Sequence, residues 1–313
     1  MSSLVVQTLG VTAPVFAMLF LGVVLRRIGW IDSAFIASAS SLVFRGCMPT
    51  LLFLSILKAD LSAALQPALL GYFVLATVAS FLFAWGWAIW RCPRADRGVY
   101  VQGAFRGNNG IVGLALASSL YGDYGLSLGS VLAGLVIIAY NILSVVVLAI
   151  YSPGGNASLR SVLLGIVRNP LIIGVAVAIP FAWWQLQLPE WLLTSAGYFA
   201  QLTLPLALIC IGGTLSLSAL RESSGTAISS SLMKMVWQPL LATLGAWLLG
   251  FRGAELGILF LYFASPTAAA SFVMARAVNS NYQLAATIIV VTTLSAAVTI
   301  NAGLLALSWL GWI

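Results

Sequence analysis

Residues 103–113 read Gly-Ala-Phe-Arg-Gly-Asn-Asn-Gly-Ile-Val-Gly and interrupt an otherwise hydrophobic stretch of the chain. The glycines loosen the backbone, and polar side chains such as Asn108 and Asn109 are unfavourable at membrane depth unless they serve a function. Membrane carriers break helices near the bilayer midplane, where the free N–H and C=O groups of the half-helix ends hold cargo. The stretch therefore predicts a broken helix beside a binding site.

The composition on either side of this stretch is that of a membrane protein. Of 313 residues, 61% are hydrophobic and 7% are charged, whereas about 25% of a soluble protein is charged. Continuous apolar windows of roughly 20 residues fit transmembrane helices and do not fit the alternating strands of a barrel. The sequence predicts an all-α polytopic membrane protein with ten spans and no soluble domain. The spans are Leu4 to Leu25, Phe35 to Leu57, Pro67 to Trp90, Val99 to Leu120, Leu126 to Tyr151, Ser161 to Ala182, Trp191 to Leu215, Ala227 to Gly250, Glu255 to Arg276 and Leu284 to Leu310.

The distribution of basic residues predicts the orientation of these spans, because cytoplasmic loops retain Lys and Arg. Placing the N-terminus outside leaves only Lys58 and Arg252 in outer connections. The inner connections then hold Arg26, Arg27, Arg91, Arg94, Arg97, Arg160, Arg221 and Arg276. We expect a multi-pass protein of the cell (inner) membrane with both termini outside. The net charge of +7 follows from this topology and requires no nucleic-acid partner.

Five spans in each half would place two duplicated halves in opposite orientation, as in many secondary carriers. Pro49 in the second span corresponds to Pro205 in the seventh, and residues 107–113 in the fourth correspond to residues 264–271 in the ninth. Matched weak points of this kind indicate a site at the midplane where the two broken helices cross. We expect residues 1–151 to form the first five-helix repeat, 152–160 a short cytoplasmic linker and 161–313 the second, inverted repeat.

Several kinds of chemistry are excluded by the residues present. The chain has no histidine, and Cys47, Cys92 and Cys210 lack the spacing of a metal site or a disulfide framework, so we expect no metal or cofactor and buried packing for the thiols. The spans contain neither paired acids nor a Ser-His dyad, which argues against an intramembrane enzyme. All seven acids fall in loops or at span ends, so no acid or histidine is available as a proton carrier. Sodium coupling or uncoupled exchange fits better.

Four basic residues lie inside spans or near their ends, namely Arg45, Arg106, Arg168 and Lys234. We interpret Arg168 and Lys234 as side chains that reach the lipid headgroups from the inner ends of their spans. Arg106 precedes Asn108 by two residues, and its paired donors suit a carboxylate. An interfacial anchor at the inner mouth is an equally good interpretation of Arg106.

An ordered set of motifs resembles the auxin efflux carrier family, which includes bacterial carboxylate carriers, among them malonate carriers, and the plant auxin exporters. The resemblance extends over nearly the whole chain. The matching motifs are Leu21–Gly29, Pro49-Thr-Leu-Leu-Phe, Asn108 with Gly113 and Tyr121-Gly122, Arg168-Asn169-Pro170, Pro205 with Gly212, and Ser265-Pro266.

The resemblance implies two inverted five-helix repeats, with crossed broken helices four and nine around the site, and transport of organic anions by an elevator-like or rocking motion. It implies that Asn108 contacts a substrate carboxylate and that Pro266 is the proline of helix nine. Ala115 and Ser271 stand where plant members have crossover prolines, and the long cytoplasmic loop of many plant carriers is reduced to Ser152–Leu159. The resemblance therefore favours a small bacterial metabolite over auxin.

The resulting hypothesis is a secondary transporter of a small organic anion. Asn108 and Asn109 would bind the carboxylate, Arg106 and positive helix ends would offset its charge, and Pro266, Thr267 and Ser271 would face it from the ninth span. Two alternatives stay open: a sodium-coupled symporter of the bile-acid-symporter type, and an anion-sensing receptor or channel. Besides the anion and the lipid bilayer, sodium and a second copy of the chain are open as partners.

Overall fold

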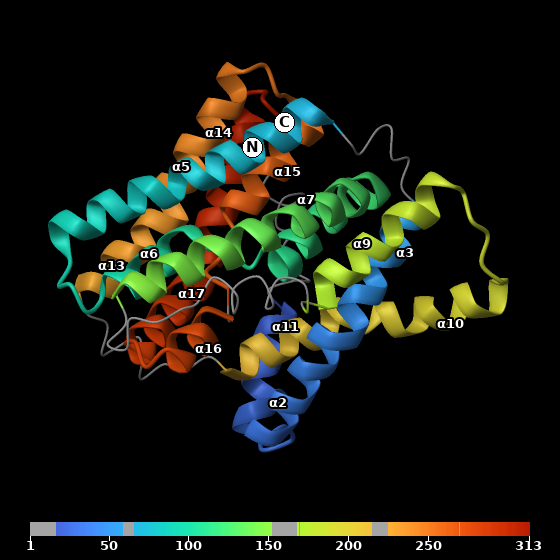
Figure 1. Cartoon of the computed structure of the whole chain (residues 1–313), viewed down its shortest axis with the longest axis horizontal. Coiled ribbons are helices and arrows are strands. Elements are labelled where there is room, and N and C mark those ends of the chain that lie inside the picture. Colours follow the sequence, from blue (N-terminus) through green and yellow to red (C-terminus); the bar gives the residue numbers. More distant parts are fainter. Residues whose placement is uncertain (1–16, 59–65, 152–167, 169, 215–224, 269) are drawn as a thin grey trace.

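The computed structural model describes residues 17–58, 66–151, 168, 170–214, 225–268 and 270–313 (Figure 1). These residues are helical and contain no β-strand, apart from one isolated bridge between residues 107 and 267. The predicted class, an all-helical polytopic protein, is thus found in the part of the chain that the structure describes. The proposed linker at 152–160, and the first residues of the chain, lie outside it.

The helices follow one another in short segments, several of which continue directly into the next. Residues 17–27 are helical. The named elements are α2 (Ser33–Leu42), the π-helix η1 (Val43–Cys47), α3 (Met48–Lys58), α5 (Pro67–Arg91), α6 (Arg97–Phe105), the π-helix η2 (Asn109–Gly113), α7 (Leu114–Tyr151), α9 (Pro170–Trp183), α10 (Glu190–Gln201), α11 (Thr203–Thr214), α13 (Gly225–Leu232), the π-helix η3 (Met233–Trp237), α14 (Gln238–Leu248), α15 (Gly253–Phe263), α16 (Ala270–Ala277) and α17 (Tyr282–Trp309).

The helices form two groups that meet along α7 (Figure 1). We call the set of α2, α3, α9, α10 and α11 the first group; within it α3 packs on α9 and α10, and α2 packs on α11. The second group contains α5, α6, α13, α14, α15, α16 and α17, whose members pack on one another around α6 and α17. Because α7 contacts α5, α6 and α15 as well as α3 and α9, it forms the main seam between the groups.

Prolines explain where several helices change their winding. Pro49 is the second residue of α3 and directly follows the π-helix η1, and Pro239 stands in the same relation to η3. Pro205 follows the interruption between α10 and α11. A proline has no N–H and its ring clashes with the carbonyl four residues earlier, so the preceding turn widens or breaks. The interruptions predicted at Pro49 and Pro205 are therefore present.

The longest helix is kinked and is longer than one membrane crossing requires. A straight α7 of 38 residues would measure about 57 Å, far more than about 30 Å of hydrocarbon. Its backbone leaves helical geometry at Gly122 (φ 57°, ψ −138°), inside the polar turn that the sequence predicts between the fourth and fifth spans. Among the described residues, five helical stretches are long and apolar enough to cross a membrane, namely Ser33–Leu51, Pro67–Arg91, Asn109–Tyr151, Glu190–Gly213 and Tyr282–Trp309. The count of ten spans remains a prediction.

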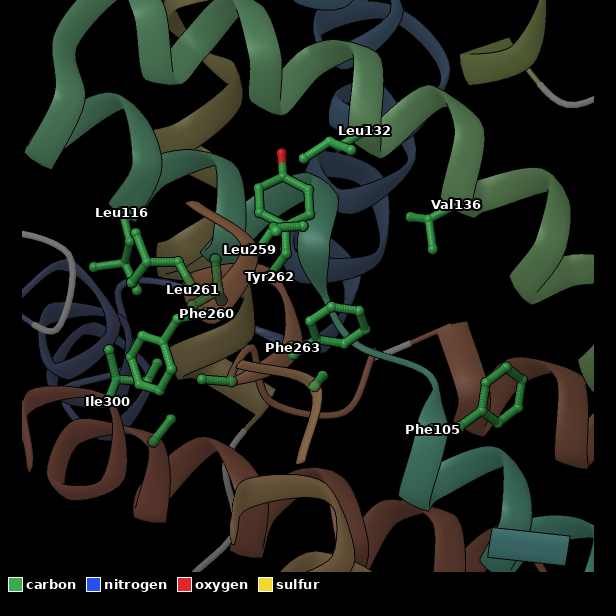
Figure 2. Packing of buried hydrophobic residues seen from close by; sticks show 14 of the residues in the cluster. Phe105, Leu116, Leu132, Val136, Leu259, Phe260, Leu261, Tyr262, Phe263 and Ile300 are labelled. Atoms are coloured by element: carbon green, nitrogen blue, oxygen red, sulfur yellow. The ribbon is translucent and has the colours of Figure 1, made fainter. Parts of the chain in front are cut away.

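An aromatic core fixes the ends of α6 and α15. Phe105, the last residue of α6, packs edge-on against Phe81 of α5 and Tyr140 of α7, with ring centroids 5.1 and 5.4 Å apart. Phe263, the last residue of α15, packs 5.2 Å from Phe73, also on α5. Figure 2 shows Phe105, Tyr262 and Phe263 within this core. The two helices therefore end at fixed points on a common support, which positions the segments that follow them.

The simpler sequence predictions about side chains are confirmed within the described residues. Cys47, Cys92 and Cys210 are buried and free. Trp30, Trp90, Trp191 and Trp309, which lie at or near the ends of the predicted spans, are all exposed. Gly125 and Gly129 are close-packing positions, because a Cβ on Gly125 would lie 2.0 Å from the Ala117 carbonyl oxygen and one on Gly129 would lie 2.7 Å from the Tyr262 hydroxyl.

Candidate functional site

Two helices break at the centre of the second group, and their broken segments pair with each other. After α6 ends at Phe105 and α15 ends at Phe263, Gly107 and Thr267 form an antiparallel bridge. The Asn108 N–H donates to the Pro266 carbonyl (2.7 Å), and the Ala268 N–H donates to the Arg106 carbonyl (3.1 Å). This pairing satisfies backbone groups that no helix serves, as burial in a membrane requires. We call residues 106–109 and 264–268 the crossover.

Gly107 lies on one strand of the crossover and Pro266 on the other. A Cβ on Gly107 would lie 2.2 Å from Asn109 Oδ1 and 3.0 Å from Lys234 Nζ, so a larger residue there would displace the ends of these two side chains. Ala115 lies within α7, and Ser271 within α16.

Asn108 and Asn109 have different surroundings. Asn108 is half-buried, and its side-chain amide makes no hydrogen bond with any residue that the structure describes, whereas its carbonyl accepts from the Val112 N–H (2.9 Å) and starts η2. Asn109 is buried, its Nδ2 donates to the Tyr140 hydroxyl (3.2 Å), and its Oδ1 has no partner. A phenolic hydroxyl both donates and accepts. Turning the Asn109 amide over would therefore keep the bond to Tyr140 and free the NH₂ group.

Arg106 is buried and extends from the crossover toward α7. Its Nη1 donates to the Tyr140 carbonyl (3.3 Å) and to Ser144 Oγ (3.2 Å), and its Nη2 donates to Asn141 Oδ1 (3.1 Å). Nη1 also contacts the Met274 sulfur at 3.1 Å, while Nε has no partner. Because the Arg106 side chain is buried between helices, it does not act as an anchor at the membrane interface. The guanidinium is a buried cation whose acceptors are all neutral.

Pro266 and Thr267 lie on the opposite strand of the crossover, and Ser271 follows that strand in α16. Pro266 supplies the carbonyl that accepts from Asn108. The Thr267 hydroxyl donates to the Gly103 carbonyl of α6 (2.7 Å), and its N–H donates to Thr292 Oγ1 (3.1 Å). Ser271 is buried, and its Oγ has no partner. Thr267 thus holds the two broken helices together, and Ser271 keeps a free hydroxyl.

The interpretation of Lys234 as a side chain that reaches the headgroups is wrong. Lys234 is fully buried; its Nζ donates to Gln238 Oε1 (2.6 Å) and to the Phe263 carbonyl (3.0 Å). Gln238 in turn donates to the Phe105 carbonyl (3.2 Å). The last four carbonyls of a helix have no partner within the helix, and this pair serves the end of each broken helix. Arg168, by contrast, is exposed as expected.

No carboxylate approaches these two cations in the part of the chain that the structure describes. Every described acid begins a helix or lies in a turn, and Asp60 and Glu222 are outside that part. The described acids are Asp32, Asp96, Asp123, Glu190 and Glu255. No group of three His, Cys, Asp or Glu that could hold a metal ion occurs within the same residues. The expected position of the acids is thus confirmed for five of the seven.

Comparison with known proteins assigns the chain to a class of transporters. A family described as membrane transport protein matches residues 9–302. The chain belongs to this auxin efflux carrier family. Similar proteins include an uncharacterized transporter of Methanothermobacter thermautotrophicus, 24% identical over 91% of this chain and 94% of its own length. Another, from Methanocaldococcus jannaschii, is 23% identical over 88% of each chain. The resemblance drawn from the motifs is confirmed.

In this auxin efflux carrier family member, all six residues predicted from sequence lie at the crossover or within four residues of it, namely Arg106, Asn108, Asn109, Pro266, Thr267 and Ser271. Lys234 and Gln238 were missed. The sequence Met233-Lys-Met-Val-Trp-Gln-Pro239 does contain a pattern that could have identified them, because a cation and an amide lie one helical turn apart within an apolar span. Residues at that spacing share one face of a helix, so the pair could have been read as inward-facing.

Proposed function

We propose that this transporter carries a small organic anion, a carboxylate, and binds it at the crossover of the fourth and ninth spans. Membership of the family supports transport across a membrane, and the nature of the cargo is our inference from the charges. Binding at paired helix breaks follows the general design of secondary carriers, in which half-helix ends and polar side chains face the substrate.

The observation that carries the proposal is a pair of buried basic side chains at the crossover with no acidic neighbour among the described residues. Lys234 is fully buried and Arg106 is 8% exposed. Among the described residues, their acceptors are carbonyl, amide and hydroxyl oxygens and one sulfur. A buried charge without a counter-ion destabilises the folded protein by several kcal/mol or more. An anionic substrate would neutralise this charge when it binds.

Uncharged donors near the cations support a carboxylate in particular. The Asn108 amide and the Ser271 hydroxyl have no hydrogen-bond partner among the described residues, and the Asn109 amide can free its NH₂ group by turning over. Carboxylate oxygens accept several hydrogen bonds at once. Donors on both sides of the crossover could thus contact one carboxylate.

The two helix groups support an alternating-access mechanism. The crossover lies within the second group, while α3 and α9 of the first group contact it through α7. A movement of one group against the other would expose the site to each side in turn, as carriers built from inverted repeats do. We propose that residues 1–151 and 161–313 are such repeats in the cell membrane, with both termini outside.

The test measures charge movement by proteoliposomes on a solid-supported membrane after jumps of malonate, succinate and acetate, with sodium or choline outside. We expect a transient current with the dianions malonate and succinate in the wild-type protein, and we expect that current to be lost in Asn108→Ala. Ser195→Ala is the control, because the exposed Ser195 donates to the Trp191 carbonyl of its own helix (2.8 Å), and it should transport normally. An Asn108→Ala current equal to the wild-type current would remove the site from the crossover.

Two alternatives give different results in the same preparation. A sodium-coupled symporter loses its current in choline. A receptor or passive channel shows no uptake stimulated by counterflow, although a receptor is still stabilised against heat by the anion. If none of the three anions produces current, counterflow or stabilisation, the carboxylate proposal is wrong.

A further inference from the structure

Lys234 lies where it can respond directly to an anion at the crossover. It belongs to η3, between α13 and α14, and its Nζ approaches the backbone of Gly107 so closely that a Cβ there would be 3.0 Å away. A Cβ at the same position would lie 2.2 Å from Asn109 Oδ1. The Lys234 amine and the Asn109 amide therefore lie on the same side of Gly107, and the amine is beside a proposed substrate-binding group.

Lys234 and Gln238 connect the two broken helices electrostatically. The C-terminal ends of helices carry a partial negative charge from their free carbonyls. Lys234 donates to the Phe263 carbonyl at the end of α15, and Gln238 donates to the Phe105 carbonyl at the end of α6. The amine therefore lies at the junction of both breaks, a position that a coupling cation such as sodium would otherwise favour.

The charged and titratable groups on the elements around Lys234 have other roles. The elements that pack against η3 are α6, α13, α14 and α17, and α15 supplies the Phe263 carbonyl. The titratable groups on these elements are Arg97 and Tyr100 on α6, Glu255 and Tyr262 on α15, and Tyr282 on α17. Arg106, which directly follows α6, is also charged.

Glu255, the acid of this set, precedes Phe263 by eight residues, about 12 Å along the helix. Arg97 donates to the carbonyls of Cys92 and Ile89, Tyr100 bonds with Ser229, and Tyr262 donates to the Gly129 carbonyl. Within the described residues, then, Lys234 has no counter-ion on any neighbouring element.

The hydrogen bonds of Lys234 are compatible with both charge states. Its two acceptors match the two N–H groups of a neutral amine, whereas an ammonium has three donors. A neutral amine avoids the buried charge when the site is empty. An anion at the crossover supplies both the counter-charge and an acceptor for the third N–H, and so it favours the ammonium.

We propose that Lys234 is the proton-carrying residue of this transporter. Binding of the anion is accompanied by uptake of one proton on the Lys234 amine, and release of the anion returns that proton, so anion and proton cross together without sodium. Proton carriers within membranes are usually acids or histidine, and in this proposal a lysine takes that role. The inference rests on the proposed function, because it requires an anion at the crossover.

The test is titration calorimetry of the purified wild-type protein with malonate, succinate and acetate between pH 7 and 9.5, where all three anions are fully ionised. Repeating each titration in buffers of different ionisation enthalpy gives the number of protons taken up. We expect uptake of up to one proton. Affinity should fall with rising pH, approaching tenfold per pH unit once the free amine is neutral. The sign follows because the bound state holds more protons than the free state.

Substitutions of Lys234 test whether this residue takes up the proton. Arg cannot lose its proton in proteins, so Lys234→Arg should bind the anion with no proton uptake and no pH dependence, and Lys234→Met should bind at least tenfold more weakly. Arg45→Gln is the control, since Arg45 is an exposed cation in the π-helix η1, and it should retain the wild-type slope.

Each outcome decides between the inference and the proposed function. Wild-type binding with constant affinity and no proton uptake overturns the role of Lys234 and leaves the proposed function intact. A wild-type slope that persists in Lys234→Arg overturns it as well. If Lys234→Arg does not fold, loss of the slope in a folded Lys234→Met that still binds weakly supports the role. If the wild-type protein binds none of the three anions, the proposed function fails and this inference fails with it.

Discussion

At the scale of single residues, the Thr267 hydroxyl is the clearest link between the two broken helices. It donates to the Gly103 carbonyl (2.7 Å), one of the last four carbonyls of α6. Thr267→Val keeps the size of the side chain but leaves this buried carbonyl unpaired, which costs about 1–3 kcal/mol. We expect lower thermal stability, measured in detergent with a thiol-reactive dye, because Cys47, Cys92 and Cys210 are buried until the protein unfolds.

Thr299→Val is the matched control. The Thr299 hydroxyl donates to the Ser295 carbonyl one turn earlier in the same helix (3.1 Å), and that carbonyl already has its backbone partner inside α17. Its loss should change the melting temperature little. Equal melting temperatures for Thr267→Val and Thr299→Val would show that the Thr267 bond does not hold the crossover together.

The sequence was informative about individual residues wherever polarity and backbone breaks coincided. Asn108, Gly107 and Pro266 could be placed at the breaks because polar groups and helix breakers are rare inside apolar spans. Lys234 was placed wrongly because a long cationic side chain near a span end has two low-energy positions, the headgroups and the protein interior. The choice depends on the distant Phe263 carbonyl, a partner that spacing along the chain does not reveal.

At the scale of elements, Gly122 kinks the long α7. Its backbone (φ 57°, ψ −138°) lies in a region that side chains make unfavourable, and a Cβ there meets no atom within 4 Å. Gly122→Ala therefore isolates backbone strain, about 1–3 kcal/mol. We expect a lower melting temperature in the same dye assay.

Gly86→Ala makes the same chemical change in a helical setting. Gly86 lies inside α5, has open space around its Cβ position and has no positive φ. Alanine favours a helix by about 0.5–1 kcal/mol relative to glycine, so this variant should melt at the wild-type temperature or slightly above it. A fall as large as that of Gly122→Ala would mean that added bulk, and not backbone strain, is responsible.

The elements themselves were predictable to different degrees. The turn at Gly122 and the break at Gly107 carried glycine and polar residues, and both were expected at these places. The π-helices η1 and η3 were not expected, because a proline marks a disturbed turn without stating whether that turn widens or breaks. Tertiary contacts make that choice; Met48, next to η1, lies against Gly110 of η2, where a Cβ would be 2.3 Å from its terminal methyl.

At the scale of the whole molecule, the sequence predicted a helical membrane transporter but not which helices pack together. In a membrane, apolar residues cover all faces of a helix, so hydrophobic periodicity does not identify its partners. The pairing of α3 with α9, and the seam along α7, arise from matched small residues such as Gly174, where a Cβ would lie 2.9 Å from the Pro49 carbonyl oxygen. That complementarity exists only in three dimensions.

The division into two groups predicts how the molecule moves if it works by alternating access. Spin labels at Trp183 on α9 and Leu82 on α5 report the distance between the groups, and labels at Leu82 and Val298 report a distance within the second group; all three sites are exposed. In a background lacking the three cysteines, malonate, succinate or acetate should shift the first distance distribution by several Å and leave the second unchanged. Domain rearrangements of this size accompany ligand binding in many proteins. An unchanged first distance with an anion that demonstrably binds, or equal changes in both, would argue against movement of the groups as rigid units and in favour of local gating at the crossover.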